Sequence, residues 1–242
     1  MSRLNEASFP NEDGATVLHS AVRCGDMDII RQVLGDNSLR EKMLEKQNAE
    51  GETPLLVACM SYNFSAAMAL LDAGANATTP SNEGETPLHS LYLFSKEEIS
   101  ALIPRLLEHG ADVKAYSKYG YRDDYSHKTI YPGTPLHRAV GWNNVHAVQA
   151  LLDAGADPLE PGTWQKLSTP LWIACSFHLG EVAETILNFL SKRIDVKSLV
   201  NGGESGDWPL IAPVLDQGYY YLNGSALGRI MRHGERYKEE TQ

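Results

Sequence analysis

The 242-residue sequence has few cysteines, no long apolar run and fewer basic than acidic residues. Its three cysteines, Cys24, Cys59 and Cys175, are far apart and odd in number, which argues against a disulfide framework and against a zinc site. No segment approaches the roughly 20 consecutive apolar residues that cross a bilayer. The amino terminus, MSRLNEASFPNEDGA, is polar and has no secretory signal pattern. We therefore expect a cytoplasmic protein with no membrane partner, and the same composition also suits a nuclear protein or one delivered into a host cell.

The balance of charge excludes one class of partner. Lys plus Arg number 21 and Asp plus Glu number 31, so the formal net charge is −10. Because an acidic chain repels phosphate backbones, we expect no nucleic acid partner. The sequence also lacks a phosphate-cradling glycine loop, a G-x-S-x-G elbow and an H-E-x-x-H pair. We therefore expect neither an enzyme nor a cofactor.

What the sequence does contain is a repeated four-residue motif. Its copies are T-V-L-H at Thr16, T-P-L-L at Thr53, T-P-L-H at Thr86 and Thr134, T-P-L-W at Thr169, and a weaker W-P-L-I at Trp208. Successive copies are 37, 33, 48, 35 and 39 residues apart. A second marker, G-A-N or G-A-D, follows at Gly74, Gly110 and Gly155. A fixed period of this length indicates a stack of similar structural units.

The motif has a physical meaning at each copy. A Thr hydroxyl can cap free backbone N–H groups, and Pro suits the first helical turn, so Thr-Pro-Leu predicts a helix start. A second helix carries apolar residues at helical spacing, as in Val145, Val148, Leu151 and Leu152. It ends at Gly155, which can adopt the left-handed conformation of a helix stop. Each helix pair leaves an apolar face that only a neighbouring repeat can cover, so the pairs must stack.

Motif and period together closely resemble the ankyrin repeat, from about Asp13 to Arg236. The resemblance implies an all-α ankyrin-repeat solenoid of helix-turn-helix units with β-hairpin fingers, one of them enlarged. We expect a single domain over residues 1–242, with the sixth repeat degenerate and acting as a terminal cap. The expected repeats are approximately 13–47, 48–80, 81–116, 129–161, 164–200 and 205–236, with an insertion at about 119–132.

The resemblance also implies a function. In this family the motif histidine, here His19, His89 and His137, is structural and hydrogen-bonds backbone in the connecting loops. Arrays of this kind bind other proteins without catalysis, through the finger tips and the exposed part of each first helix. We expect a monomer whose concave groove binds a protein segment with basic and apolar residues. The corresponding positions are Glu50, Glu52, Glu83 and Glu85 on the fingers and Phe94, Trp142 and Phe177 on the first helices. Alternatively, the three aromatic residues pack as ordinary core.

One finger is longer than the others. Gly110 and Thr134 are 24 residues apart, against 12 between Gly74 and Thr86. The additional residues either present a recognition surface or fold back and seal a local irregularity, because tyrosine suits both purposes. A further alternative is an enzyme or a small-molecule or metal site built on Asp123, Asp124 and His127. The insertion residues that we expect to contact a partner are Tyr119, Tyr121, Arg122, Tyr125 and Tyr131.

Overall fold

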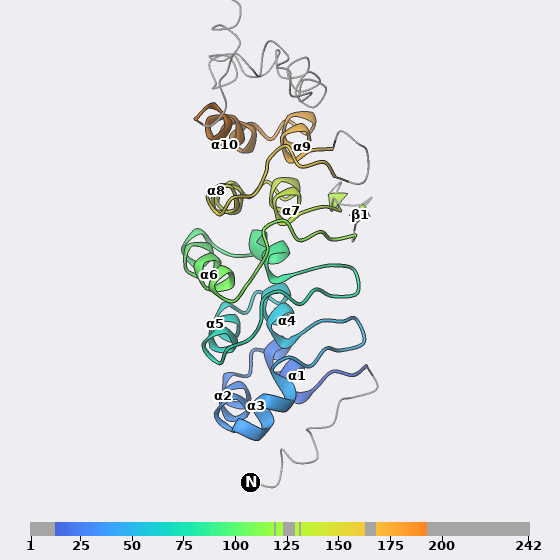
Figure 1. Ribbon diagram of the computed structural model, residues 1–242, viewed down its shortest axis with the longest axis vertical. Helices are drawn as coiled ribbons and strands as arrows, with labels where there is room; N and C mark the ends of the chain where they lie inside the picture. Colours follow the sequence, from blue (N-terminus) through green and yellow to red (C-terminus); the bar gives the residue numbers. More distant parts are fainter. Residues whose placement is uncertain (1–12, 119, 123–128, 131, 163–167, 193–242) are drawn as a thin grey trace, which may run out of the picture. The chain divides into compact units, whose positions relative to one another are not determined.

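The structure is a computed structural model, and it describes residues 13–118, 120–122, 129–130, 132–162 and 168–192 (Figure 1). The chain forms two compact units, Met1–Tyr119 and Gly120–Gln242. The expected single domain therefore stays a prediction. The sixth repeat, with its expected role as a cap, lies outside the described residues.

Unit 1 is a stack of helix pairs. The first helices pack on one another, as α1 does on α4 and α4 on η1, and the second helices do the same, as α2 does on α5 and α5 on α6. Figure 1 shows α1 and α4 in one layer and α2, α5 and α6 in the other. The elements are α1 (Val17–Cys24), α2 (Met27–Gly35), α3 (Asn37–Met43), α4 (Pro54–Met60), α5 (Phe64–Asp72), the 3-10 helix η1 (Pro87–Leu93) and α6 (Lys96–Glu108).

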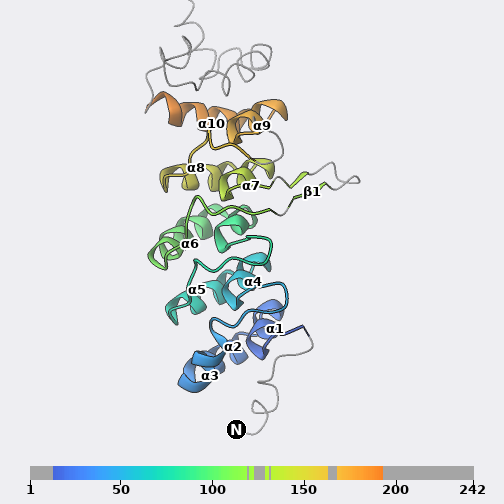
Figure 2. The ribbon, with the colours of Figure 1, turned by 45° about the vertical axis from the view of Figure 1, so that its right-hand side comes forward.

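Unit 2 repeats this arrangement and adds a short antiparallel strand pair. Strand β1 pairs with β2 so that Tyr121 lies opposite Ile130 and Arg122 opposite Thr129. Helix α7 packs on α9, and α8 packs on α10. Figure 2 shows the strand pair extending away from α7. The elements are β1 (Tyr121–Arg122), β2 (Thr129–Ile130), α7 (Pro135–Gly141), α8 (Val145–Asp153), α9 (Pro170–Ser176) and α10 (Gly180–Ser191).

The expected all-α fold of stacked helix-turn-helix units is confirmed, and so are the helix starts at the five Thr residues of the motif. Thr53 Oγ1 accepts a hydrogen bond from the Leu56 N–H at 3.3 Å, and Thr169 Oγ1 accepts one from the Trp172 N–H at 3.1 Å. These bonds satisfy a donor that the first turn of a helix leaves free. The short first helices are then held by burial, since Leu55 and Leu56 in α4 are fully buried.

The first and third repeats depart from the regular pattern of two short helices. The additional residues after Leu34 build helix α3, whose N-cap Asp36 accepts hydrogen bonds from the Ser38 and Leu39 N–H groups at 2.9 and 3.1 Å. In the third repeat the first helix is a 3-10 helix, and the second helix, α6, has 13 residues. Helix α6 begins with a capping box in which Ser95 and Glu98 each accept a hydrogen bond from the other's backbone N–H.

The core lies between the two helix layers. Leu70 and Leu71 of α5 and Leu151 and Leu152 of α8 are at most 1% exposed. Cys59 and Cys175 are also buried, and burial raises the pKa of each thiol to about 12. Within the described residues, no helix is both long enough and apolar enough to span a bilayer.

Candidate partner-binding site

The motif histidines are part of the framework. His19 Nδ1 accepts a hydrogen bond from the Thr16 N–H at 3.1 Å and lies 2.9 Å from Thr16 Oγ1. Its Nε2 donates to the Glu52 carbonyl of the next finger at 3.0 Å. Burial lowers the pKa of His19 below its usual 6.5, which favours the neutral ring that this geometry requires.

The other two histidines repeat this geometry. His89 makes the same contacts with Thr86, and His137 with Thr134, at 3.1 and 2.9 Å in both cases. His137 Nε2 donates to the Ser168 carbonyl at 3.2 Å. The structural role that the resemblance implied for these side chains is therefore confirmed.

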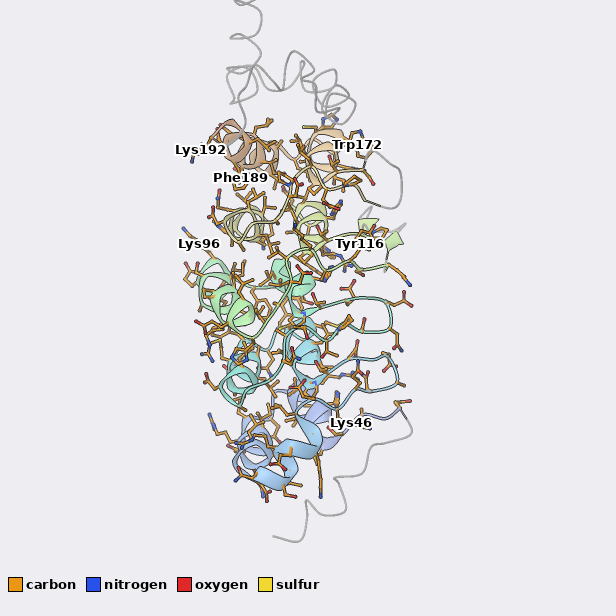
Figure 3. All side chains as sticks on the ribbon, viewed as in Figure 1. Lys46, Lys96, Tyr116, Trp172, Phe189 and Lys192 are labelled. Carbon is orange, nitrogen blue, oxygen red and sulfur yellow. The ribbon has the colours of Figure 1, made fainter. Side chains whose placement is uncertain are left out.

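The fingers of unit 1 are tied together by one backbone hydrogen bond per pair of neighbours. The donor is a residue near one finger tip and the acceptor is the carbonyl of an acidic residue at the previous tip. The three bonds run from Ala49 to Asp13 at 2.7 Å, from Asn82 to Glu50 at 2.9 Å and from Lys118 to Glu83 at 2.8 Å. The side chains of Asp13, Glu50 and Glu83, which we call the finger row, are exposed. Figure 3 shows the finger side chains of unit 1 along the right-hand edge of the molecule.

Only two of the four predicted finger glutamates are exposed. Glu50 and Glu83 are, and both belong to the finger row. The side chain of Glu52 is 15% exposed, accepts a hydrogen bond from Asn48 Nδ2 at 2.8 Å and lies 3.9 Å from Arg23. Glu85 is 7% exposed and accepts a hydrogen bond from Ser117 Oγ.

The predicted exposure of Glu52 and Glu85 is therefore wrong. Each directly precedes the Thr that starts a first helix, where the chain leaves the finger and enters the stack. Its carboxylate consequently holds neighbouring segments together, whereas Glu50 and Glu83 lie in the tip turns themselves.

The aromatic residues predicted on the first helices are also only partly as expected. Phe94 is 5% exposed, and its ring packs edge-on against Phe64 with the ring centroids 6.5 Å apart. The reason is that η1 ends at Leu93, so Phe94 takes an extended conformation that leads its ring into the core. Phe94 therefore belongs to the core, as the alternative held. In unit 2, Trp142 is half-buried and Phe177 is 51% exposed, and each is the C-cap of its first helix.

For the insertion, the structure describes the backbone of Tyr121 and Arg122, which form β1. Tyr119, Tyr125 and Tyr131 lie outside the described residues, and so do Asp123, Asp124 and His127. Both interpretations of the insertion therefore stay predictions. In the described part of the chain, no group of three or more His, Cys, Asp or Glu side chains is placed to hold a metal ion.

Sequence reasoning missed the most exposed apolar side chains of unit 1. Tyr62 is 63% exposed and Met60 is 43% exposed, at the turn between α4 and α5. Aligning the repeats on their Thr residues places Tyr62 at the position of Gly25 in the first repeat. That substitution was the available signal, because an aromatic residue at a glycine position of a turn is unusual.

Comparison with known proteins identifies the family to which this chain belongs. Residues 18–117 match a family model described as ankyrin repeats (3 copies), and residues 133–162 match a model described as ankyrin repeat. The chain is 30% identical to the E3 ubiquitin-protein ligase KEG of Arabidopsis thaliana over 155 residues, which is 61% of this chain and 9% of that protein. It is 32% identical to human ankyrin repeat and SOCS box protein 16 over 179 residues, which is 73% of this chain and 36% of that protein.

A third relative is human transient receptor potential cation channel subfamily A member 1, which is 26% identical over 215 residues, or 83% of this chain and 18% of that protein. The match therefore spans at most 36% of the length of any of these three relatives. Since the two family models together cover more than half of its residues, the chain belongs to the ankyrin-repeat family.

Proposed function

We propose that this chain is a non-catalytic module that binds another protein through the concave groove and the enlarged finger. Ankyrin repeats are generally protein–protein interaction modules, which supports the class of function. The buried, hydrogen-bonded motif histidines support it further, because side chains fixed in this way serve the stack and not chemistry.

The observation that carries the proposal is the finger row. Backbone hydrogen bonds of 2.7 to 2.9 Å fix the three tips relative to one another, so Asp13, Glu50 and Glu83 present one carboxylate per repeat. A partner segment that lies along the fingers of unit 1 would meet these charges in order. Because the row is preformed, little ordering entropy is lost on binding. A segment with Lys or Arg residues suits it best.

Unit 2 contributes an apolar contact in this proposal. Phe177 is 51% exposed at the end of α9, and Trp142 is half-buried at the end of α7, the first helix of the preceding repeat. Large aromatic side chains are frequent anchors of protein interfaces because they offer much contact area at a low entropic cost. The partner would therefore combine basic residues with apolar ones.

The charge of the finger row can be tested with the double variant Glu50→Gln/Glu83→Gln. Once a partner has been identified by crosslinking in native lysate and purified, we expect the variant to associate more slowly and with a weaker dependence on salt. The matched control is Glu41→Gln/Glu97→Gln, which removes the same charge from exposed positions on α3 and α6. Equal association rates for the two double variants would refute the proposed role of the finger row.

The role of the enlarged finger needs a separate experiment. Replacing the hairpin that holds β1 and β2 by a finger of ordinary length should leave the melting temperature nearly unchanged, because each neighbouring repeat still buries its own helices. Binding should weaken tenfold or more, which corresponds to about 1.4 kcal/mol. A clear fall in melting temperature, with binding affected only through it, would decide for the structural interpretation of the insertion.

A further inference from the structure

The turn between α4 and α5 contains a backbone conformation that its residue type disfavours. Tyr62 has a φ of 60°, in the left-handed region that residues with a Cβ atom rarely adopt. The equivalent residues of the first, fourth and fifth repeats share this conformation: Gly25 has a φ of 75°, Asn143 a φ of 54° and His178 a φ of 57°. Glycine, asparagine and histidine are the residue types that occur there most readily. Tyrosine is thus a costly choice at this position.

Burial does not offset that cost. Tyr62 is 63% exposed, which makes it the most exposed large hydrophobic side chain of the described residues. Met60, two residues earlier, is 43% exposed. Neither side chain gains much from removal from water, because the hydrophobic contribution scales with the area that is buried. Strain at an exposed residue is a reason to look for a function that uses its side chain.

The residue that follows Tyr62 fixes the turn on one side. Asn63 Nδ2 donates to the Val22 carbonyl of α1 at 3.0 Å, and Asn63 Oδ1 accepts from the Ala66 N–H at 3.0 Å. The second bond caps α5, and the first ties the turn to the preceding repeat. The backbone at Tyr62 is therefore held by its neighbour and not by its own ring.

The next residue fixes the turn on the other side. The Phe64 ring packs against Phe94 of the following repeat, at 6.5 Å between centroids. Toward the first repeat, the adjacent turn has no side chain at Gly25, where an added Cβ would lie 3.7 Å from Asn63 Nδ2. The Tyr62 ring thus projects from a rigid turn beside a position without a side chain. Because the backbone that carries the ring is already fixed, binding costs little backbone entropy at this turn.

We propose that Met60 and Tyr62, the Tyr62 site, form a docking point for a partner segment in which Arg or Lys stands next to an apolar residue. This inference rests on the proposed function and names a contact of the partner outside the finger row. The exposed face of a tyrosine ring attracts a guanidinium or ammonium group, and the flexible methionine side chain adapts to an apolar neighbour.

The charges around the Tyr62 site favour the same occupant. Asp26, which follows Gly25, is an exposed carboxylate. Two basic residues of the first repeat already have acidic neighbours, with Arg23 3.9 Å from Glu52 and Arg31 3.4 Å from Asp28. At the start of α6, Lys96 (labelled in Figure 3) is followed by Glu97, so these two charges cancel. With a net charge of −10 over the chain, a cationic segment is the favoured partner.

The experiment uses a phage-displayed library of random dodecapeptides, selected on the full chain at low salt. Enriched peptides are synthesised, and their Kd values are measured by fluorescence polarisation for the wild type and three variants. The first is Tyr62→Asn, which removes the ring and keeps a residue that tolerates the left-handed region. The second is Leu107→Gln, which replaces another exposed apolar side chain of unit 1. The third is Glu50→Gln/Glu83→Gln, which tests the finger row.

We expect the enriched peptides to carry Arg or Lys next to an apolar residue and to bind Tyr62→Asn at least tenfold more weakly. Leu107→Gln should stay within twofold of the wild type. The melting temperature of Tyr62→Asn should be unchanged or higher by up to about 4 °C, since the strain is relieved and little burial is lost. Under these results the ring serves the partner and not the fold.

Four results would overturn the inference, and they separate it from the proposed function. In the first, peptides bind Tyr62→Asn as tightly as the wild type but bind Glu50→Gln/Glu83→Gln more weakly. This result would contradict the Tyr62 site and would still agree with the proposed function. A melting temperature more than about 4 °C lower for Tyr62→Asn would show that the ring is structural. Self-association that Tyr62→Asn abolishes would make a second copy the occupant. A selection that enriches no binding peptide would overturn both proposals.

Discussion

Two glycines of unit 1 allow the cost of a backbone conformation to be separated from the cost of a steric clash. Gly51 has a φ of 77° and Gly74 a φ of 91°, so an added side chain is strained at both. A Cβ atom at Gly51 would lie 2.6 Å from Asn82 Oδ1 and 2.7 Å from the Asn82 backbone nitrogen. At Gly74 it would meet no atom within 4 Å. We therefore compare the stability of the variants Gly51→Ala and Gly74→Ala in the full chain.

The free energies of unfolding follow from these contacts. The left-handed conformation costs an alanine roughly 1–2 kcal/mol, and the lower entropy of its unfolded chain returns roughly 0.4–1 kcal/mol. Gly74→Ala should thus lose about 1 kcal/mol. Gly51→Ala should also disturb two hydrogen bonds of Asn82, from its N–H to the Glu50 carbonyl at 2.9 Å and from its Nδ2 to the Ala49 carbonyl at 2.8 Å. At about 1 kcal/mol each, these bring its loss to about 3 kcal/mol.

Thermal unfolding followed by circular dichroism measures the difference. For a chain of this size, 1 kcal/mol corresponds to a shift of roughly 2–4 °C in melting temperature. We expect Gly74→Ala to melt about 3 °C below the wild type and Gly51→Ala about 9 °C below it, by the same conversion. Equal shifts for the two variants would show that the hydrogen bonds between fingers add nothing to stability.

Three further predictions concern the core, the histidines and the thiols. Leu151→Ala should lower the free energy of unfolding by roughly 2–5 kcal/mol, measured with urea, because Leu151 is fully buried. Glu83→Gln should change it by less than roughly 0.5 kcal/mol. Equal effects of the two variants would contradict the repeat register. Because burial lowers the pKa of His19, the unfolded chain binds the proton more readily, so the unfolding free energy should fall as the pH drops below about 6.5. The variant His19→Gln should flatten that pH dependence, and an unchanged dependence would assign it to other groups. A thiol reagent such as DTNB should label exposed Cys24 in the native protein, but Cys59 and Cys175 only after unfolding. The reason is that burial raises the pKa of each of the latter two thiols to about 12. Labelling of all three cysteines in the native protein would contradict the burial of Cys59 and Cys175.

Local chemistry explains why the sequence alone predicts so much of this fold. A Thr before Pro-Leu starts a helix wherever it occurs, and the cap at Thr53 depends on residues only three positions apart. The repeated period then requires each apolar helix face to meet a similar neighbour. The structural role of His19 follows from the family resemblance, and its contacts with Thr16 join residues only three positions apart.

The repeat architecture, the helix starts and the family can therefore be predicted without coordinates. Which side chains reach the surface cannot, because exposure depends on contacts between repeats. Glu52 and Glu50 have the same chemistry, yet Asn48 and Arg23 engage the first and leave the second exposed. Phe94 is buried because η1 ends early and a ring from the neighbouring repeat lies beside it. Tyr62 is exposed because a hydrogen bond to the preceding repeat and a ring contact with the following one fix its turn in a conformation that no local preference of tyrosine would select.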